Sequence, residues 1–262
     1  MNVFILCDLE GISGVTSIEQ MERGTEGYER ACRALERSLN ICADAARAAG
    51  AENIYYLDGH GGGGNLNPDN IVDYCTGVDI AGWEELVVSG KIDCQIELGS
   101  HARAGTIGGF LDHTLTSRAW FSYKIGDKEY SEVGIHAAFL GLYDVPVVLV
   151  SGDDVACRQA GEYIDGVFTA PVKVASVRNI AHDYDGADEI LRDGVKRALE
   201  GYKTVKPHKI DLPTDITLTL YRTDMCEEIL ESTKFDVKRL DARTVTKRAT
   251  PDNLRKYSDF KF

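Results

Sequence analysis

Acidic and imidazole side chains follow three apolar segments of this sequence, at the point where each segment ends. These side chains are Asp8 and Glu10 after the first segment, His60 after the second and His101 after the third. Carboxylate oxygens combined with imidazole nitrogens suit zinc, manganese or iron better than magnesium or calcium, which prefer oxygen ligands. The sequence therefore predicts a metal site where these segments end.

The spacing of the acidic pair supports this prediction. Asp8 and Glu10 are two residues apart, so on a regular strand both side chains point to one face, and Gly11 lets the chain turn away directly afterwards. On these residues alone, a cap on a following loop or helix is the alternative to a pair of metal ligands.

The histidines lie close to glycines. His60 precedes four consecutive glycines, so a bound metal would anchor an otherwise mobile loop, and Asp58 could orient the imidazole ring. These glycines do not form a phosphate-binding loop, because the pattern G-x-x-x-x-G-K-[ST] is missing. His113 follows His101 by twelve residues, beyond a pair of glycines. A single histidine is more often structural than a ligand, but two of six at predicted strand ends favour a metal site.

A parallel sheet is needed to bring these side chains together, and the sequence predicts one. Residues Arg30–Ala49 carry apolar side chains at three- and four-residue steps and are followed by Gly50, which is typical of an amphipathic helix with a glycine stop. This helix connects the strand that ends at Leu6 to the strand that ends at Leu57, which makes a β-α-β unit. The acidic pair and the first histidine therefore lie at the same edge of the sheet.

The fold class that these patterns predict is α/β, with a Rossmann-like, mostly parallel sheet flanked by helices. The other expected elements are helices at 132–142, 153–163 and 187–199, an apolar central strand at 145–150, and a hairpin at 120–130 that turns at Gly126-Asp127. From residue 207 the pattern becomes one of alternating apolar and polar residues. We therefore expect a metal-binding catalytic domain at 1–206 and a smaller C-terminal α+β region at 207–262.

Composition excludes several classes of function. The 262 residues include 29 Lys and Arg against 42 Asp and Glu, and a net charge of −13 argues against nucleic acid or an anionic membrane as a partner. No apolar stretch approaches the roughly 20 residues of a membrane span, and no basic signal region begins the chain. The seven cysteines are scattered without a C-x-x-C pair, so we expect reduced thiols and a cytoplasmic location.

Several blocks of the sequence form a specific set when they are taken in order. They are Asp8-Leu9-Glu10-Gly11-Ile12-Ser13-Gly14, Asp58-x-His60 with Asn65-Leu66, Gly99-x-His101-Ala102-Arg103-Ala104, His113, Glu132-x-Gly134, and Tyr143-Asp144-Val145-Pro146-Val147 through Gly152-Asp153-Asp154. This set resembles the D-aminopeptidase (DppA-type) zinc metallopeptidase family over roughly residues 1–180. Cys7 and the four-glycine loop are departures from the family's pattern.

The resemblance implies two zinc ions per subunit, with Asp8 as the shared carboxylate. The other ligands that it implies are Glu10, His60, His101 and Glu132. From the residues alone, Glu132 is only an acidic residue in the first turn of a helix, a common position for glutamate. His113 matches the family's candidate for acid/base catalysis or nucleophilic attack. The family's decamer of two stacked pentameric rings implies a homo-oligomer here, with the active sites inside.

The expected function is that of a zinc-dependent aminopeptidase acting on short peptides, D-amino-acid-containing dipeptides or amides among them, with a metal-bridging hydroxide as nucleophile. His113 would pass a proton to the leaving amine or stabilise the oxyanion. One alternative is a haloacid-dehalogenase-like phosphatase, which needs an aspartate where Cys157 stands and has no use for His60 and His101. Another is a catalytically silent, metal-stabilised peptide-binding ring subunit, which loss of His113 or Glu132 would have favoured.

Overall fold

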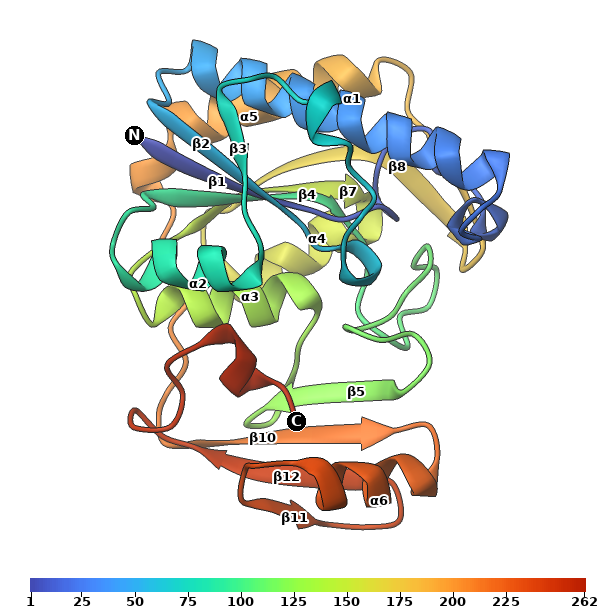
Figure 1. Cartoon of the computed structure of the whole chain (residues 1–262), viewed down its shortest axis with the longest axis vertical. Coiled ribbons are helices and arrows are strands. Elements are labelled where there is room, and N and C mark those ends of the chain that lie inside the picture. Colours follow the sequence, from blue (N-terminus) through green and yellow to red (C-terminus); the bar gives the residue numbers. More distant parts are fainter.

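The computed structural model describes residues 1–262 and contains two sheets separated by helices (Figure 1). The larger sheet has the strand order β3-β2-β1-β4-β7-β8-β9. Its strands are β1 (Asn2–Cys7), β2 (Asn53–Asp58), β3 (Cys75–Gly77), β4 (Cys94–Ser100), β7 (Val147–Asp153), β8 (Phe168–Val177) and β9 (Ile180–Asp183). Neighbouring strands are parallel except for β8 and β9, which confirms the mostly parallel α/β fold.

The centre of this sheet is the predicted β-α-β unit. Helix α1 (Glu26–Ala48) connects β1 to β2, and the two strands pair in parallel. The chain continues outwards to β3 and then returns to β4 on the other side of β1. In open α/β sheets, ligands bind outside the carboxyl ends of the strands where the strand order reverses in this way. The ends of β1 and β4 therefore border the expected position of a site.

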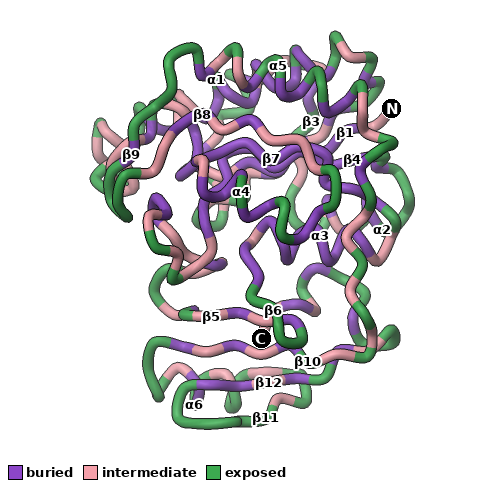
Figure 2. Tube along the Cα trace, turned by 180° about the vertical axis from the view of Figure 1, so that it is seen from behind, coloured by how far each residue is buried: buried purple, intermediate pink, exposed green.

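Helices cover both faces of the larger sheet (Figure 1). Helices α1 and α5 (Ala187–Glu200) cover one face, and α2 (Ile80–Val88), α3 (Glu132–Gly141) and α4 (Asp154–Tyr163) cover the other. The apolar stripe of α1 is buried, as its spacing predicts, and Gly50 stops the helix with a φ of 91°. Figure 2 shows that buried residues are concentrated in the strands of this sheet and in the helix faces that pack on it.

The smaller sheet is antiparallel and has the order β11-β12-β10-β5-β6. Its strands are β5 (Trp120–Ile125), β6 (Lys128–Glu129), β10 (Thr214–Leu220), β11 (Val237–Arg239) and β12 (Thr244–Ala249), and helix α6 (Thr223–Ser232) lies beside them. The predicted hairpin at 120–130 is confirmed as β5 and β6. The domain boundary near residue 206 stays a prediction, and this sheet takes two of its strands from before it.

The sequence patterns did not predict every element. The stretch 65–91 was assigned no element, and it contains β3 and α2. In α2 the apolar residues do not follow one stripe, because Ile80 and Val88 are exposed while Trp83 and Val87 are buried. None of the helices combines the length and apolar character that crossing a membrane requires.

Candidate metal centre

The acidic pair lies in the chain that leaves β1, next to the end of β4. The amide of Asp8 donates to the carbonyl of Leu98 over 2.8 Å, and the amide of Gly11 donates to the carbonyl of Gly99 over 2.8 Å. These hydrogen bonds continue the contact with β4 beyond the end of β1, and Glu10 is only 4% exposed. Two separate segments of the chain are thereby fixed side by side at the carboxyl edge of the sheet.

Asp8 lies between two imidazoles. Its Oδ1 is 3.3 Å from Nδ1 of His60, and its Oδ2 is 3.3 Å from Nε2 of His101. Each imidazole also faces a second carboxylate: Oε2 of Glu10 is 2.9 Å from His60, and Oε1 of Glu132 is 3.3 Å from His101. The structure thus brings together the five residues that the sequence analysis assigned to metal binding, from four segments of the chain.

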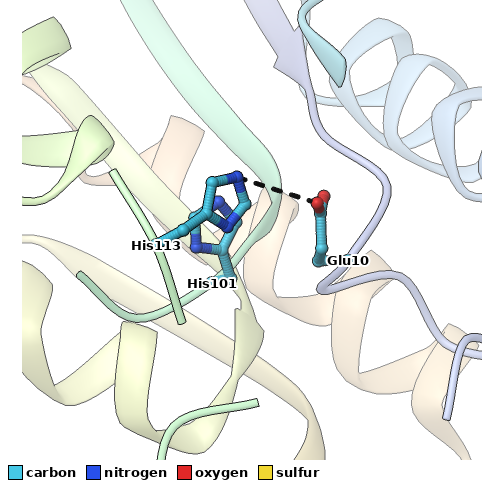
Figure 3. A group of neighbouring side chains, drawn as sticks. All are labelled: Glu10, His101 and His113. Carbon is cyan, nitrogen blue, oxygen red and sulfur yellow. Dashed lines mark ion pairs between the residues drawn. The ribbon is translucent and has the colours of Figure 1, made fainter. Parts of the chain in front are cut away.

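His113 reaches the same cluster from the loop beyond β4 (Figure 3). Its Nε2 is 3.9 Å from Oε1 of Glu10 and 3.6 Å from Oε1 of Glu132. The ring stacks on His101, with 3.9 Å between ring centroids and 8° between planes. Nδ1 of His113 is 2.8 Å from the carbonyl oxygen of Leu111, so Nδ1 donates a hydrogen bond to this carbonyl and Nε2 faces the carboxylates.

His101 has the free nitrogen that a metal ligand needs. Its Nδ1 lies 3.0 Å from the carbonyl oxygen of Ala102 and donates to it, so Nε2 is the nitrogen that a metal would bind in place of a proton. This Nε2 is buried and makes no hydrogen bond. Because a buried polar atom without a partner is costly, an ion at this position would satisfy it.

The charges of the cluster depend on one another. Burial opposes a charge on His60, but the carboxylates of Glu10 and Asp8 outweigh burial and raise the pKa of His60 to about 10. Burial opposes a charge on His101 as well, and the carboxylates of Glu132 and Asp8 outweigh it and raise the pKa of His101. Burial also opposes a charge on the carboxylates, and the imidazoles nevertheless lower the pKa of Asp8 and lower that of Glu132 to about 2.

The donor set fits a metal of the zinc type. Three overlapping groups of side chains place one ligand atom each within 4.8 Å of one another: Asp8 with Glu10 and His60, Asp8 with His101 and Glu132, and Glu10 with His101 and His113. The first two groups share Asp8, whose Oδ1 faces His60 in one group and whose Oδ2 faces His101 in the other. Mixed imidazole and carboxylate ligands of this kind are typical of zinc and related ions.

The loop that carries His60 is fixed by the protein itself, which differs from the expectation of a loop anchored by metal. Asp58 accepts hydrogen bonds from the backbone and side-chain amides of Asn65, at 2.7 and 2.8 Å, and Asn65 donates to the carbonyl of His60 over 2.7 Å. Arg23 donates to the carbonyls of Gly61 and Gly63. Asp58 therefore holds the backbone of the loop and makes no hydrogen bond to the imidazole ring, whose Nδ1 faces Asp8 and Glu10.

Lys173 supports the site and was missed by the sequence analysis. Its ammonium group is completely buried and donates to the carbonyls of Glu10, Ile12 and Val15, with 2.9 Å to Glu10. The lysine thereby fixes the segment that follows Asp8. The available signal was a single charged residue between two valines in an apolar segment, and such a residue is rarely buried without a specific partner.

Two cavities meet at the cluster, and Asp8 and Glu132 line both. One of about 490 Å³ is lined by Glu10, His60 and His113. The other, of about 630 Å³, has more apolar walls and extends away from His113 towards α2. The cluster therefore lies between two spaces large enough for parts of a small molecule.

Comparison with known proteins agrees with this site. The family model Peptidase_M55, described as D-aminopeptidase, matches residues 1–256. A D-aminopeptidase of Bacillus subtilis (strain 168) is 31% identical over 215 residues, which cover 79% of this chain and 77% of that protein. The structure of the Zn-dependent D-aminopeptidase DppA from Bacillus subtilis, a self-compartmentalizing protease, aligns with a TM-score of 0.90 and 26% identity and covers 99% of this chain and 95% of that one.

A cluster of carboxylates and imidazoles at the point where the strand order of a parallel sheet reverses defines a metal-dependent enzyme of the α/β class. The chain belongs to the D-aminopeptidase family and is a metallo-aminopeptidase, a hydrolase. Family membership and the observed fold confirm the resemblance found in the sequence, and the phosphatase alternative is set aside.

Proposed function

We propose that this protein is a zinc-dependent aminopeptidase that holds two zinc ions per subunit and hydrolyses short peptides. The observation that carries the proposal is the position of Asp8, whose two oxygens face two different imidazoles at 3.3 Å each. Asp8 would be the shared ligand, His60 and Glu10 would complete one site, and His101 and Glu132 the other. The zinc dependence of the related DppA structure supports the choice of metal.

Bound zinc ions would supply Lewis acidity for the substrate carbonyl and an activated, bridging hydroxide as nucleophile. The residues around them have separate tasks. The amide of Leu115 donates to Oε1 of Glu132 over 2.7 Å and so orients this carboxylate. His113, whose Nε2 faces the cluster, would give a proton to the leaving amine or stabilise the oxyanion.

The proposed substrates are peptides with a free amino terminus, D-amino-acid-containing dipeptides or amides among them. The D-aminopeptidase relatives support the D configuration. We further propose a homo-oligomer, a decamer of two pentameric rings, and the description of the DppA structure as self-compartmentalizing supports an assembly of this kind.

Chelation and reconstitution test the proposed function. Removal of metal should abolish hydrolysis of a panel of D- and L-dipeptides and amides, and zinc should restore it with two ions per chain by metal analysis. Manganese reconstitution on the same panel compares the two metals. Full activity of metal-free protein would contradict the proposal, and one ion per chain at full activity would reduce the centre to a single zinc.

A further inference from the structure

The larger of the two cavities leads from the metal centre to a lysine. Its volume is about 630 Å³; Asp8 and Glu132 line it where it meets the centre, and Lys261 also lines it. The lining also includes the apolar residues Leu57, Val78 and Ile80 and the acidic residues Asp58 and Asp79. A substrate bound at the centre can therefore extend through this cavity towards an ammonium group.

Lys261 has no anionic partner within the chain. No carboxylate lies within ion-pair distance of its Nζ, which instead lies 4.5 Å from the ring centroid of Tyr257. Burial lowers the pKa of the Lys261 ammonium, and the negative charges of Glu132 and Glu84 oppose this effect. An ammonium group that is partly desolvated and unpaired gains more from an incoming anion than a solvated one.

The segment that carries Lys261 is held in place by hydrogen bonds from residues distant in the sequence. Lys247 donates to the carbonyls of Asp259 and Lys261, and Tyr123 donates to the carbonyl of Phe260 over 2.7 Å. In Figure 1 this segment, coloured dark red, passes between the helices α2 and α3 and the smaller sheet. Because the backbone is already ordered, binding of a ligand by the side chain does not require the segment to fold.

The face of α3 that carries Glu132 extends this wall. His136 lies one helical turn beyond Glu132 and lines the same cavity, and its Nε2 is 3.2 Å from the hydroxyl oxygen of Tyr257. His136 Nδ1 in turn lies 3.1 Å from Glu97, a buried carboxylate. This chain of hydrogen bonds connects α3 to the segment that carries Lys261, so the position of the lysine is coupled to the helix that begins at the metal centre.

We propose that Lys261 binds a carboxylate group of the peptide substrate and so makes the cavity selective for short, anionic peptides. The inference rests on the proposed aminopeptidase function. In a short peptide the carboxylate is either the terminal one or that of an acidic side chain, and both present the same chemistry to the ammonium group. With the scissile carbonyl at the metal centre, only a short chain can place its terminal carboxylate within this cavity.

The test compares matched substrates on three zinc-loaded variants. Lys261→Met keeps the aliphatic stem and removes the charge, Lys261→Arg keeps a cation, and Lys256→Met is the control, an exposed lysine on the same segment that does not line the cavity. The substrates are D-Ala-D-Ala and its amide for the terminal carboxylate, and D-Glu amide and D-Gln amide for the side-chain carboxylate. If wild type prefers the L isomers, the same pairs are used in that form.

We expect Lys261→Met to raise the KM of one carboxylate-bearing substrate by about 10- to 100-fold, the range for loss of one charge-assisted hydrogen bond. Its kcat and the KM of the matched neutral amide should stay within about twofold, Lys261→Arg should largely restore the KM, and Lys256→Met should change neither. The substrate pair that responds identifies which carboxylate binds.

Equal effects of Lys261→Met on the acid and the amide, or no effect on either pair, would overturn the inference. Failure of the proposed function is a different result, because wild type would then hydrolyse none of the four compounds. In that case calorimetric titration of D-Ala-D-Ala into wild type and Lys261→Met still decides whether the lysine binds a carboxylate: equal affinities, or binding to neither, contradict it.

Discussion

His101 and His113 have parallel, stacked rings but different surroundings. Nε2 of His101 is buried between Asp8 and Glu132, at 3.3 Å from each, and has no hydrogen bond. Nε2 of His113 lies farther from its carboxylates, at 3.6 and 3.9 Å, and borders the 490 Å³ cavity. This difference supports our proposal that His101 holds metal, while His113 acts on the substrate.

Two alanine variants separate these roles. His113→Ala should keep the zinc content of wild type while kcat falls by about 10² to 10⁴, the usual contribution of a general acid or an oxyanion donor. His101→Ala should lose zinc together with activity. Metal analysis and turnover of one dipeptide are compared after both variants are shown to be folded and assembled. A normal kcat in His113→Ala would remove this residue from the mechanism, and loss of zinc would make it a ligand.

The raised pKa of His60 predicts how the stability of metal-free protein depends on pH. The folded chain binds this proton more tightly than the unfolded chain, since the pKa rises from 6.5 to about 10. The resulting stabilisation is fully present below pH 6.5 and is lost as the pH rises towards 10. The lowered pKa of Glu132 has its effect at acidic pH. The ionised carboxylate stabilises the fold above pH 4.5, and this stabilisation is lost as the pH falls towards 2.

Thermal unfolding of chelator-treated protein measures this effect. Between pH 6.5 and 9 the melting temperature of wild type should fall more steeply than that of His60→Ala, because the variant lacks the group that loses its proton. Zinc competes with the same proton, so zinc affinity should rise over this range. Identical slopes for the two proteins would show that the proton on His60 does not stabilise the fold.

The metal centre depends on the close approach of β1 and β4. Gly99, at the end of β4, has a φ of 84°, and a Cβ atom there would lie 2.0 Å from the carbonyl oxygen of Asp8. Gly99→Ala should therefore push the two strand ends apart, destabilise the fold by about 2–4 kcal/mol and weaken zinc binding.

Gly90→Ala is the matched control for this variant. Gly90 also has a positive φ, of 69°, but open space surrounds the position of its missing Cβ. The free energy of unfolding of Gly90→Ala should fall only by the cost of the positive φ, about 1 kcal/mol, and the variant should keep its zinc affinity. Denaturant unfolding and zinc titration of both variants give the comparison. Equal losses in stability and in zinc affinity would contradict a specific role for the close approach.

The sequence predicted those elements whose residues follow one clear period. The apolar steps of α1, between the strands that end at Leu6 and Leu57, predicted the parallel β-α-β unit, and with it the common edge of Asp8 and His60. Helix α2 was missed because apolar side chains lie on its exposed side as well as its buried side. A pattern of burial is visible in a sequence only where exposed positions are polar.

Residues that act through long-range contacts were not predictable from spacing. Glu132 begins α3 in a position that is ordinary for glutamate, and only the fold brings its carboxylate next to His101. Lys173 lies more than 150 residues from the carbonyls that it binds. Lys261 reaches its cavity only because the last segment returns from the smaller sheet to α3.

The surface beside the His113 cavity has the character of a contact between subunits. Ile18, Val177 and Ile180 are exposed, at 37%, 54% and 48%. Their segments adjoin, because the amide of Ile18 donates to the carbonyl of Asn179, and Ile18 also lines the cavity. Exposed apolar side chains gathered next to a cavity are typical of an interaction surface.

A ring assembly predicts a limit on substrate size as well as a larger mass. Light scattering should give a stable particle far above the 28.8 kDa of one chain, and a folded protein should not be cleaved under conditions where dipeptides are, because a subunit placed over the cavity restricts access to it. Val177→Asp should weaken the assembly if this surface is buried in it, since a buried unpaired carboxylate is costly. An active wild-type monomer would contradict the assembly, whereas an oligomer unaffected by Val177→Asp would place the subunit contact elsewhere on the molecule.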